Sequence, residues 1–359
     1  MLGTTEIIAT AEAEPLASEM VCNAEMVRIL KENGIDLGQR GVGYDIPIKG
    51  FHGIHSRWLV PPTVTSHKLA LEAGRNLIEA MLAADPAFDV TKVRVVHGGS
   101  SSPDKIFPGS SNRTQGSLGI PAAFAEARDV SPGCHSAVDG LILLHRSLQC
   151  IAVEEKITTP LYGWLINGES IGSSANQPDS SNYLLWGCGA TGLGARHTPG
   201  RSKKIGIRRT KAFSDGQFAD LTESIGMGCD PSYLGLKPNG IMGENGCYGR
   251  EVQDYIRGPM VEQLKMFIAS CEIDPKKNKA WLFGHNPTFN GAKIFGELSG
   301  FLDERVHTVA AERANTSSTS PIINYHDARK RQLINPGDHV FLVGYGTGMA
   351  GAFVYLIES

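Results

Sequence analysis

DVSPGCHSAVDGLILLHRSLQC, residues 129–150, combines the end of a strand, a sharp turn and the start of a helix. Asp129-Val130 resembles a strand end, and Pro132-Gly133 predicts the turn. The spacing of the apolar residues that follow predicts a helix over residues 136–150. This succession of strand, turn and helix is typical of α/β proteins.

Cys134 lies in the turn, at the N-terminus of the predicted helix. The positive end of a helix dipole favours a thiolate, so the pKa of this thiol is expected to be lowered. A lowered pKa suits a nucleophilic cysteine. The alternative of an inert buried thiol stays open for Cys134, and it is the expectation for Cys22, Cys150, Cys229 and Cys271.

Outward from this segment, strand-like runs alternate with helical apolar spacing along the chain. Strands are predicted at residues 6–10, 92–97, 183–186, 279–283, 339–343 and 352–357. Helices are predicted at residues 23–33, 69–84, 136–150, 251–270 and 290–298. Ser66 is the expected N-cap of the second helix. The alternation predicts the α/β class, and Pro199-Gly200 is the candidate boundary between halves 1–200 and 201–359.

Composition narrows the class of protein. The 359 residues include 34 basic and 37 acidic side chains, so the formal net charge of −3 gives no overall attraction to nucleic acid. Seven cysteines without a C-x-x-C pair favour reduced thiols in the cytoplasm over a disulfide framework. The N-terminal residues lack the basic region of a signal peptide, and no apolar run reaches 18 residues. No membrane span is therefore expected.

Many of the 42 glycines fall in two motifs. Gly187-Cys-Gly-Ala-Thr-Gly192 satisfies the G-x-G-x-x-G pattern of dinucleotide sites, and Arg208 and Arg209 follow at a distance that suits NADP. The residues after Gly192 predict no helix to hold a pyrophosphate, which favours close strand packing over an NADP-dependent oxidoreductase. Gly344-Tyr-Gly-Thr-Gly348 predicts a tight turn that can aim a backbone N–H at a reaction centre.

Two polar residues in the C-terminal half are further candidates. His285 directly follows the strand-like run 279–283 and Gly284, and ligand-handling groups collect at such positions in α/β sheets. A histidine in a surface loop is the alternative. Asn315 lies in RANTSSTSP, a context that equally suits a capping or turn residue.

Two histidines near Cys134 and one basic run raise two further possibilities, a metal site and a charged docking surface. His135 and His145 could join Cys134, but their spacing fits no common zinc pattern, so no metal is expected. The basic run 201–211, RSKKIGIRRTK, is expected to be a solvated face. Its alternative is docking of a phosphate-rich partner such as coenzyme A or an acidic carrier protein.

Six motifs occur in an order that characterises one family. They are Gly53-Ile-His-Ser-Arg57, Asp129-Val-Ser-Pro-Gly-Cys134, Gly187-Cys-Gly-Ala-Thr-Gly192, Gly284-His-Asn-Pro-Thr-Phe-Asn290, Ala314-Asn-Thr-Ser-Ser-Thr-Ser-Pro321 and Gly337-Asp-His-Val-Phe-Leu-Val-Gly-Tyr-Gly-Thr-Gly348. In this order they resemble the conserved motifs of the ketoacyl synthase III family of the thiolase superfamily. The resemblance covers nearly the whole chain from about Glu6 onward.

The resemblance implies the thiolase fold, in which two similar βαβαβα-type halves form a five-layered αβαβα body, usually as a homodimer. It implies a catalytic set of Cys134, His285 and Asn315, with the backbone N–H groups of Cys134 and Gly346 as oxyanion donors. It also places Phe107 at the acyl pocket. No metal or redox cofactor is implied, and the partners are acyl-coenzyme A or acyl carrier protein.

The implied reaction loads an acyl group from a thioester onto Cys134. A malonyl or β-ketoacyl thioester then condenses with it, with neutral donors from His285 and Asn315 on the enolate oxygen. The alternative is transfer of the acyl group to an alcohol or amine without a new carbon–carbon bond. Asn315 favours condensation, because only that reaction needs a donor for an enolate.

Several positions depart from the family pattern. The aspartate of G-D-G-A-G-A is Cys188, the glycine before the family asparagine is Ala314, and His135 follows the nucleophile. The segment before Gly53 has no match for the Trp and Arg that grip coenzyme A in the housekeeping bacterial enzyme. These departures suggest a specialised relative in polyketide or fatty-acid chemistry of secondary metabolism.

Overall fold

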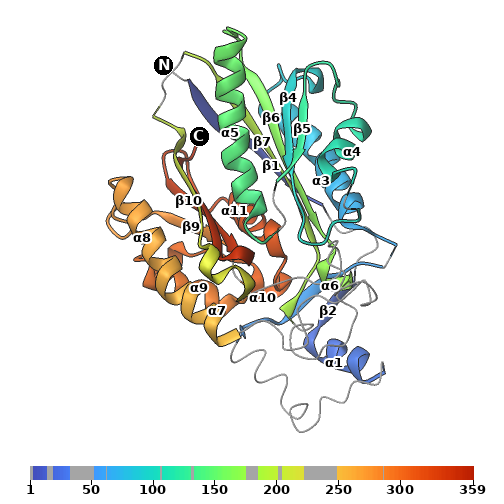
Figure 1. Ribbon diagram of the computed structural model, residues 1–359, viewed down its shortest axis with the longest axis vertical. Coiled ribbons are helices and arrows are strands. Elements are labelled where there is room, and N and C mark those ends of the chain that lie inside the picture. Colours follow the sequence, from blue (N-terminus) through green and yellow to red (C-terminus); the bar gives the residue numbers. More distant parts are fainter. Residues whose placement is uncertain are drawn as a thin grey trace.

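The computed structural model describes residues 3–13, 19–32, 52–61, 63–105, 107–130, 133–174, 185–200, 204–221, 249–285 and 287–359. These residues form two large sheets and a two-stranded ribbon (Figure 1). The larger sheet has the strand order β1 (Thr4–Glu12), β7 (Gly189–Thr198), β6 (Leu161–Glu169), β4 (Val93–Gly98) and β5 (Glu126–Asp129). The four-stranded sheet has the order β8 (Gly206–Ser214), β11 (Ala350–Ile357), β10 (His339–Gly346) and β9 (Trp281–Gly284). The ribbon pairs β2 (Glu19–Cys22) with β3 (Ser56–Leu59).

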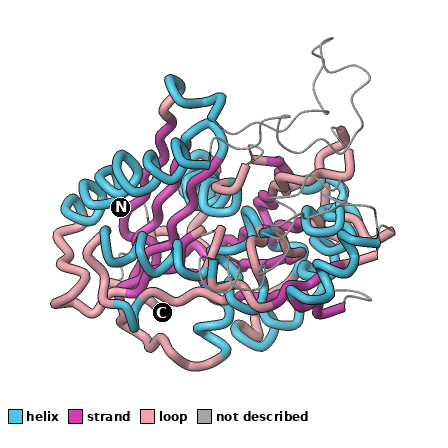
Figure 2. Tube along the Cα trace, turned by 90° about the horizontal axis from the view of Figure 1, so that it is seen from below, coloured by secondary structure: helices cyan, strands magenta, loops and turns pink. Residues whose placement is uncertain are grey.

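Helices cover both outer faces and fill the space between the sheets (Figures 1 and 2). The outer face of the five-stranded sheet carries α3 (Ser66–Ala84) and α4 (Ser110–Ser117). Between the sheets lie α5 (Ser136–Glu154) and α11 (Ser320–Lys330). The outer face of the four-stranded sheet is covered by a long helical segment made of α7 (Gly249–Tyr255), a π-helical turn (Ile256–Met260) and α8 (Val261–Ser270). Shorter helices are α1 (Asn23–Glu32), α6 (Ile171–Ser174), α9 (Phe289–Leu298) and α10 (Ala310–Arg313). The resulting order of layers is αβαβα, as the α/β thiolase-fold prediction requires.

The helix predicted at residues 136–150 is confirmed as α5, which extends to Glu154. Leu141 and Leu144 have no exposed surface, because α5 packs against strands of both sheets. Among the described helices, α5 alone is long and apolar enough to cross a membrane by length and composition. Core helices pass the same test, and this one lies between the two sheets (Figure 1).

The first glycine motif runs into strand β7 and opens no helix. A Cβ atom at Gly192 would lie 3.0 Å from the Leu77 Cβ of α3, and one at Gly194 would collide with the Met81 sulfur. The glycines therefore let α3 approach the sheet closely. Without a helix N-terminus after the motif, the dinucleotide reading has no phosphate site.

The remaining predicted elements agree with the structure except at two places. Thr65, not Ser66, caps α3: its side chain accepts from the Lys68 N–H, while Ser66 is the first helical residue. The strand predicted at 183–186 is reduced to a single bridge between Trp186 and Asn315, and residues 183–184 lie outside the described part. The helix predicted at 251–270 contains a π-helical turn, which includes Gly258 and Pro259.

Several elements have no counterpart in the sequence prediction: β2, β3, β6, β7, β8, α4, α6, α10 and α11. All nine residues of β6 are buried, so its sequence shows no alternation that would mark a strand. The passage from one sheet to the other falls at the candidate boundary, because β7 ends at Thr198 and β8 begins at Gly206. The likeness of the two halves stays a prediction.

Candidate active site

Cys134 lies between the end of β5 and the start of α5, as the sequence predicts. Gly133 precedes it with φ of 147°, a backbone conformation that side chains rarely adopt. A Cβ atom at Gly133 would also lie 2.6 Å from Thr347 Oγ1. The turn therefore needs glycine, and it carries Cys134 to the end of β10. Residues 131–132 of the predicted turn lie outside the described part.

The expectation of a lowered pKa for the Cys134 thiol is wrong. Burial raises the pKa to about 11, and the nearby charge of Glu169 adds to this, while hydrogen bonds from Ser317 and Ser101 oppose it. Loss of hydration therefore outweighs the helix dipole at this site. Since the thiol is protonated at neutral pH, a base must take its proton when the sulfur attacks.

His285 follows β9 and is 4% exposed, so the surface-loop alternative does not hold. Its Nδ1 lies 3.0 Å from the Ser317 carbonyl oxygen, which can only accept, so Nδ1 carries the proton and Nε2 carries the lone pair. Burial lowers the pKa of His285 to about 4, and the charge of His135 lowers it further. His285 is thus a neutral imidazole whose free nitrogen is a base.

Asn315 is held by its backbone, which donates to the Leu185 carbonyl at 2.8 Å. Its Oδ1 accepts from the Ser317 N–H at 2.8 Å, which fixes the orientation of the amide. In the described part of the chain, the Asn315 Nδ2 group donates to no other residue. That nitrogen is a neutral hydrogen-bond donor of the kind an enolate oxygen needs.

Gly346 ends β10 directly against the cysteine. A Cβ atom at Gly346 would lie 2.7 Å from the Cys134 Cβ and 3.1 Å from the Cys134 nitrogen. Only glycine lets the backbone approach so closely. The role of these two N–H groups as an oxyanion hole stays a prediction, and the close approach of the two residues is what it requires.

Ser317 joins the predicted residues, and sequence reasoning missed it. Its carbonyl oxygen accepts from His285, its N–H donates to Asn315, and its hydroxyl lies 3.4 Å from the Cys134 sulfur as a donor. Its φ of 50° is in the left-handed region, which turns the three groups toward different partners. A serine within the run TSSTS gives no signal of such a role.

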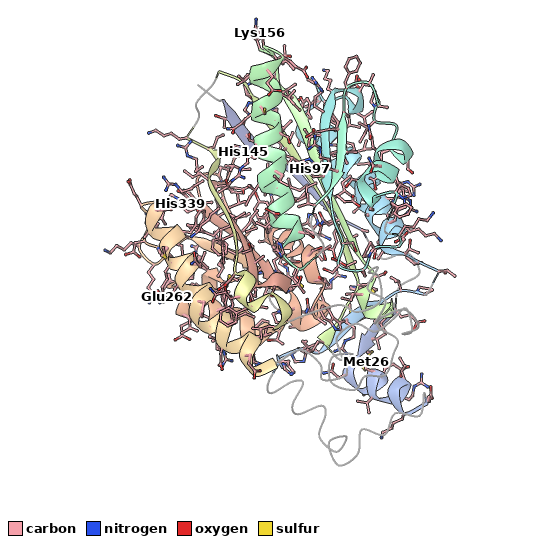
Figure 3. The ribbon with its side chains drawn as sticks, in the orientation of Figure 1. Met26, His97, His145, Lys156, Glu262 and His339 are labelled. Carbon is pink, nitrogen blue, oxygen red and sulfur yellow. The ribbon has the colours of Figure 1, made fainter. Side chains whose placement is uncertain are left out.

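The place of Phe107 at the acyl pocket stays a prediction, and this chain alone does not bury the residue. Its side chain is 82% exposed. The histidines considered for a metal also separate: His145 lies partway along α5, eleven residues from Cys134, and bonds Thr5 Oγ1 at 2.8 Å (Figure 3). Among the described residues, no group of three or more His, Cys, Asp or Glu side chains could hold a metal ion.

Ala314 occupies the position of the family's glycine and has φ of 56° and ψ of −156°, a region that belongs almost entirely to glycine. We expect Ala314→Val to lower the free energy of unfolding by about 3 kcal/mol, because a branched side chain adds clashes to this backbone strain. Ala314→Gly relieves the strain but removes a buried methyl group, so its change should stay within about 1 kcal/mol. Urea unfolding of both variants measures this, and a Val variant as stable as the wild type would contradict it.

Comparisons with known proteins agree with this fold. Residues 276–357 match the family model of the C-terminal part of 3-oxoacyl-[acyl-carrier-protein] synthase III. The chain is 27% identical over 322 residues to a β-ketoacyl-[acyl-carrier-protein] synthase III of Granulibacter bethesdensis, covering 88% of this chain and 91% of that protein. It is 24% identical over 315 residues to the enzyme of the same name from Rhodobacter capsulatus, covering 86% and 89%.

Two solved structures have the same fold over 99% of both chains. One is a 3-oxoacyl-(acyl-carrier-protein) synthase III, with a TM-score of 0.80 at 19% identity, and the other is a variant of Xanthomonas campestris OleA, with a TM-score of 0.79 at 16% identity. The fold is therefore that of the thiolase superfamily. In sequence the chain is similar to the β-ketoacyl-[acyl-carrier-protein] synthase III enzymes, and the low identities make it a divergent relative of them.

Proposed function

We propose that this acyltransferase is a condensing enzyme that loads an acyl group onto Cys134 and extends it by one carbon–carbon bond. The observation that carries the proposal is a set of three hydrogen bonds: Ser317 accepts from His285 and donates to Asn315 and to Cys134. These bonds gather a nucleophile, a neutral base and a neutral donor around one residue. Each of the three has a distinct use in a two-stage reaction.

In the first stage, the Cys134 sulfur attacks the carbonyl carbon of an acyl thioester. His285 Nε2 takes the thiol proton, since Nδ1 is occupied with the Ser317 carbonyl. The backbone N–H groups of Cys134 and Gly346 hold the oxyanion. The carbon–sulfur bond of the substrate then breaks, and the leaving thiolate receives the proton from His285. The products are an acyl-cysteine and a free thiol such as coenzyme A.

In the second stage, a malonyl thioester loses CO2 and leaves an enolate. Asn315 Nδ2 donates to the enolate oxygen. The assignment of Nδ1–H to Ser317 makes Asn315 the principal donor here, while His285 Nε2 has no proton to give in this tautomer. The enolate carbon attacks the acyl carbonyl, the carbon–sulfur bond to Cys134 breaks, and one proton from water restores the thiol.

Incubation with an acyl-coenzyme A and a malonyl thioester tests this function. We expect CO2 and a β-ketoacyl thioester in equal amounts. Acyl transfer to an alcohol or amine, the alternative, would instead give an ester or amide without CO2. A broad thioester panel that yields only such products would overturn the proposed condensation.

The rate of acyl loading should depend on pH through His285. Its pKa of about 4 means that the base is protonated, and inactive, only below about pH 4. Loading measured by stopped flow should therefore rise through about pH 4 and stay flat across neutrality, because the thiol titrates only near pH 11. An inflection of the loading rate near pH 6.5 would show that His285 titrates as an ordinary exposed histidine.

The donor that we propose is an acyl thioester of coenzyme A or of an acyl carrier protein, and no metal or redox cofactor takes part.

A specialised role in secondary metabolism is supported by Cys188, Ala314 and His135, which replace smaller or acidic family residues. His135 is 8% exposed, so it changes the buried surroundings of the nucleophile. The described cysteines are all free, which suits a reducing cytoplasm.

We also propose a homodimer that forms along β5. This strand is the edge of its sheet, and it is flanked by two exposed aromatic side chains, Phe107 and Phe124, at 82% and 66%. An open strand edge beside exposed apolar groups favours pairing with a second copy. Sedimentation should give twice the mass of 38.5 kDa, and Phe124→Glu should shift it toward the monomer.

A further inference from the structure

Glu169, the last residue of β6, is a fully buried acidic side chain beside the site. Four donors surround its carboxylate: the Ser318 hydroxyl at 2.6 Å, the Ser101 N–H at 2.9 Å, the Ser102 hydroxyl at 2.9 Å and the Ser100 hydroxyl at 3.0 Å. In the described part of the chain, no Lys or Arg forms an ion pair with it. Hydrogen bonds alone therefore stabilise this buried group.

The donors come from two segments far apart in the sequence. Residues 100–102 follow β4, and Ser318 follows the candidate catalytic Asn315 in the loop before α11. The two segments also meet directly, because Ser101 Oγ lies 2.8 Å from Ser317 Oγ. Ser317 Oγ in turn donates to the Cys134 sulfur. A continuous series of contacts thus runs from Glu169 through two serines to the nucleophile.

We propose that Glu169 is a positioning residue of the acyl-loading site, which holds Ser101 and Ser317 so that their hydroxyls fix the Cys134 sulfur. The role deepens the proposed function and rests on it. Glu169 touches neither substrate nor thiol. It acts by joining the 100–102 segment to the loop that carries Asn315, Ser317 and Ser318.

The neighbours of Cys134 shift the pKa of its thiol in opposite directions. Burial raises the pKa of Glu169, and the four hydrogen-bond donors around it oppose that rise. In its ionised form the carboxylate disfavours a thiolate at Cys134, while the hydroxyls of Ser101 and Ser317 favour it. The other titratable groups around Cys134 are Tyr345 from β10, His285 after β9 and the neighbouring His135. Neutralising Glu169 removes its charge and thereby lowers the pKa of the Cys134 thiol, whereas loss of the Ser101 hydroxyl raises it. Opposite shifts of the pH dependence in the Glu169 and Ser101 variants therefore separate the charge of Glu169 from the hydroxyls that it positions.

The experiment measures alkylation of Cys134 by iodoacetamide from pH 7 to 12, followed by mass spectrometry of the tryptic peptide 129–146, whose one cysteine is Cys134. Glu169→Gln should lower the pH of half-maximal alkylation by about one unit, which is about tenfold in rate at pH 8. The matched control is Glu358→Gln, another buried carboxylate, which bonds Tyr325 and Arg329 in place of site residues. The control should leave the alkylation profile unchanged.

Ser101→Ala provides a second variant that does not require Glu169→Gln to fold. It removes the hydroxyl between Glu169 and Cys134, so it should shift the profile to higher pH. A Glu169→Gln profile that superimposes on the wild type, or a Ser101→Ala profile that does so, would overturn the proposal. Because alkylation needs no acyl substrate, the wild-type enzyme could fail to condense malonyl thioesters while these shifts still appear, and the two proposals fail separately.

Discussion

Cys134→Ala is expected to lower the rate of β-ketoacyl product formation by about 10⁴-fold or more. The substitution removes the sulfur that we propose as the carrier of the acyl group, and it leaves the surrounding packing in place because the Cβ against Gly346 is retained. Steady-state assays with acyl-coenzyme A and a malonyl thioester measure this loss. Far-UV circular dichroism of the same sample checks that the fold is intact.

Cys271→Ala is the matched control for this variant. Burial raises the pKa of the Cys271 thiol to about 11, as it does for Cys134. Cys271, however, lies at the end of α8, on the outer face of the four-stranded sheet. It should retain the wild-type rate. If Cys134→Ala kept even a tenth of the wild-type rate, a covalent mechanism through Cys134 would be wrong.

Asn315→Ala is expected to slow condensation by about 10²- to 10³-fold while acyl loading changes much less. In the proposed mechanism the asparagine supplies a donor to the enolate oxygen, which exists only in the second stage. The loss of its contact with the Ser317 N–H affects both stages, so loading should fall to a smaller degree. Rapid quench of each stage separately gives the two rates.

Two further variants make the Asn315 result specific. Asn315→Asp keeps the oxygen that accepts from Ser317 but loses the donor, so it should impair condensation as strongly as alanine does. Asn324→Ala removes another buried asparagine, whose side chain bonds Val309 and Gly284, and should lower stability without changing the ratio of the two rates. Equal losses of loading and condensation in Asn315→Ala would contradict an enolate role.

Sequence patterns predicted the elements that carry the site but not all of their neighbours. The strand end and the helix on either side of Cys134 follow from their sequence patterns and are confirmed, while Pro132 of the predicted turn lies outside the described residues. Strands β6 and β7 were missed because every residue of β6 is buried and β7 is rich in glycine. Neither strand shows the alternation of a half-exposed sheet.

The residues of the candidate site could be predicted from the sequence only in part, and the protonation state of its thiol could not. The family resemblance named Cys134, His285 and Asn315, and the structure brings all three to Ser317. The position of Cys134 at a helix N-terminus predicts a lowered pKa, but burial of the thiol raises it. That burial comes from packing by segments distant in the sequence, so the direction of the shift could not be predicted from the local sequence. Ser317 contacts Cys134 and Glu169 contacts Ser318, and each of these pairs is separated by more than a hundred residues of sequence.

A single-turnover measurement by intact mass tests the central claim most directly. Mixing the enzyme with one acyl-coenzyme A should raise its mass by one acyl group, located on the 129–146 peptide. Adding a malonyl thioester should return the mass to that of the free enzyme and release one β-ketoacyl thioester and one CO2 for each acyl group lost. An acyl group on another peptide, or one on Cys134 that leaves without CO2 and without a β-keto product, would contradict the account.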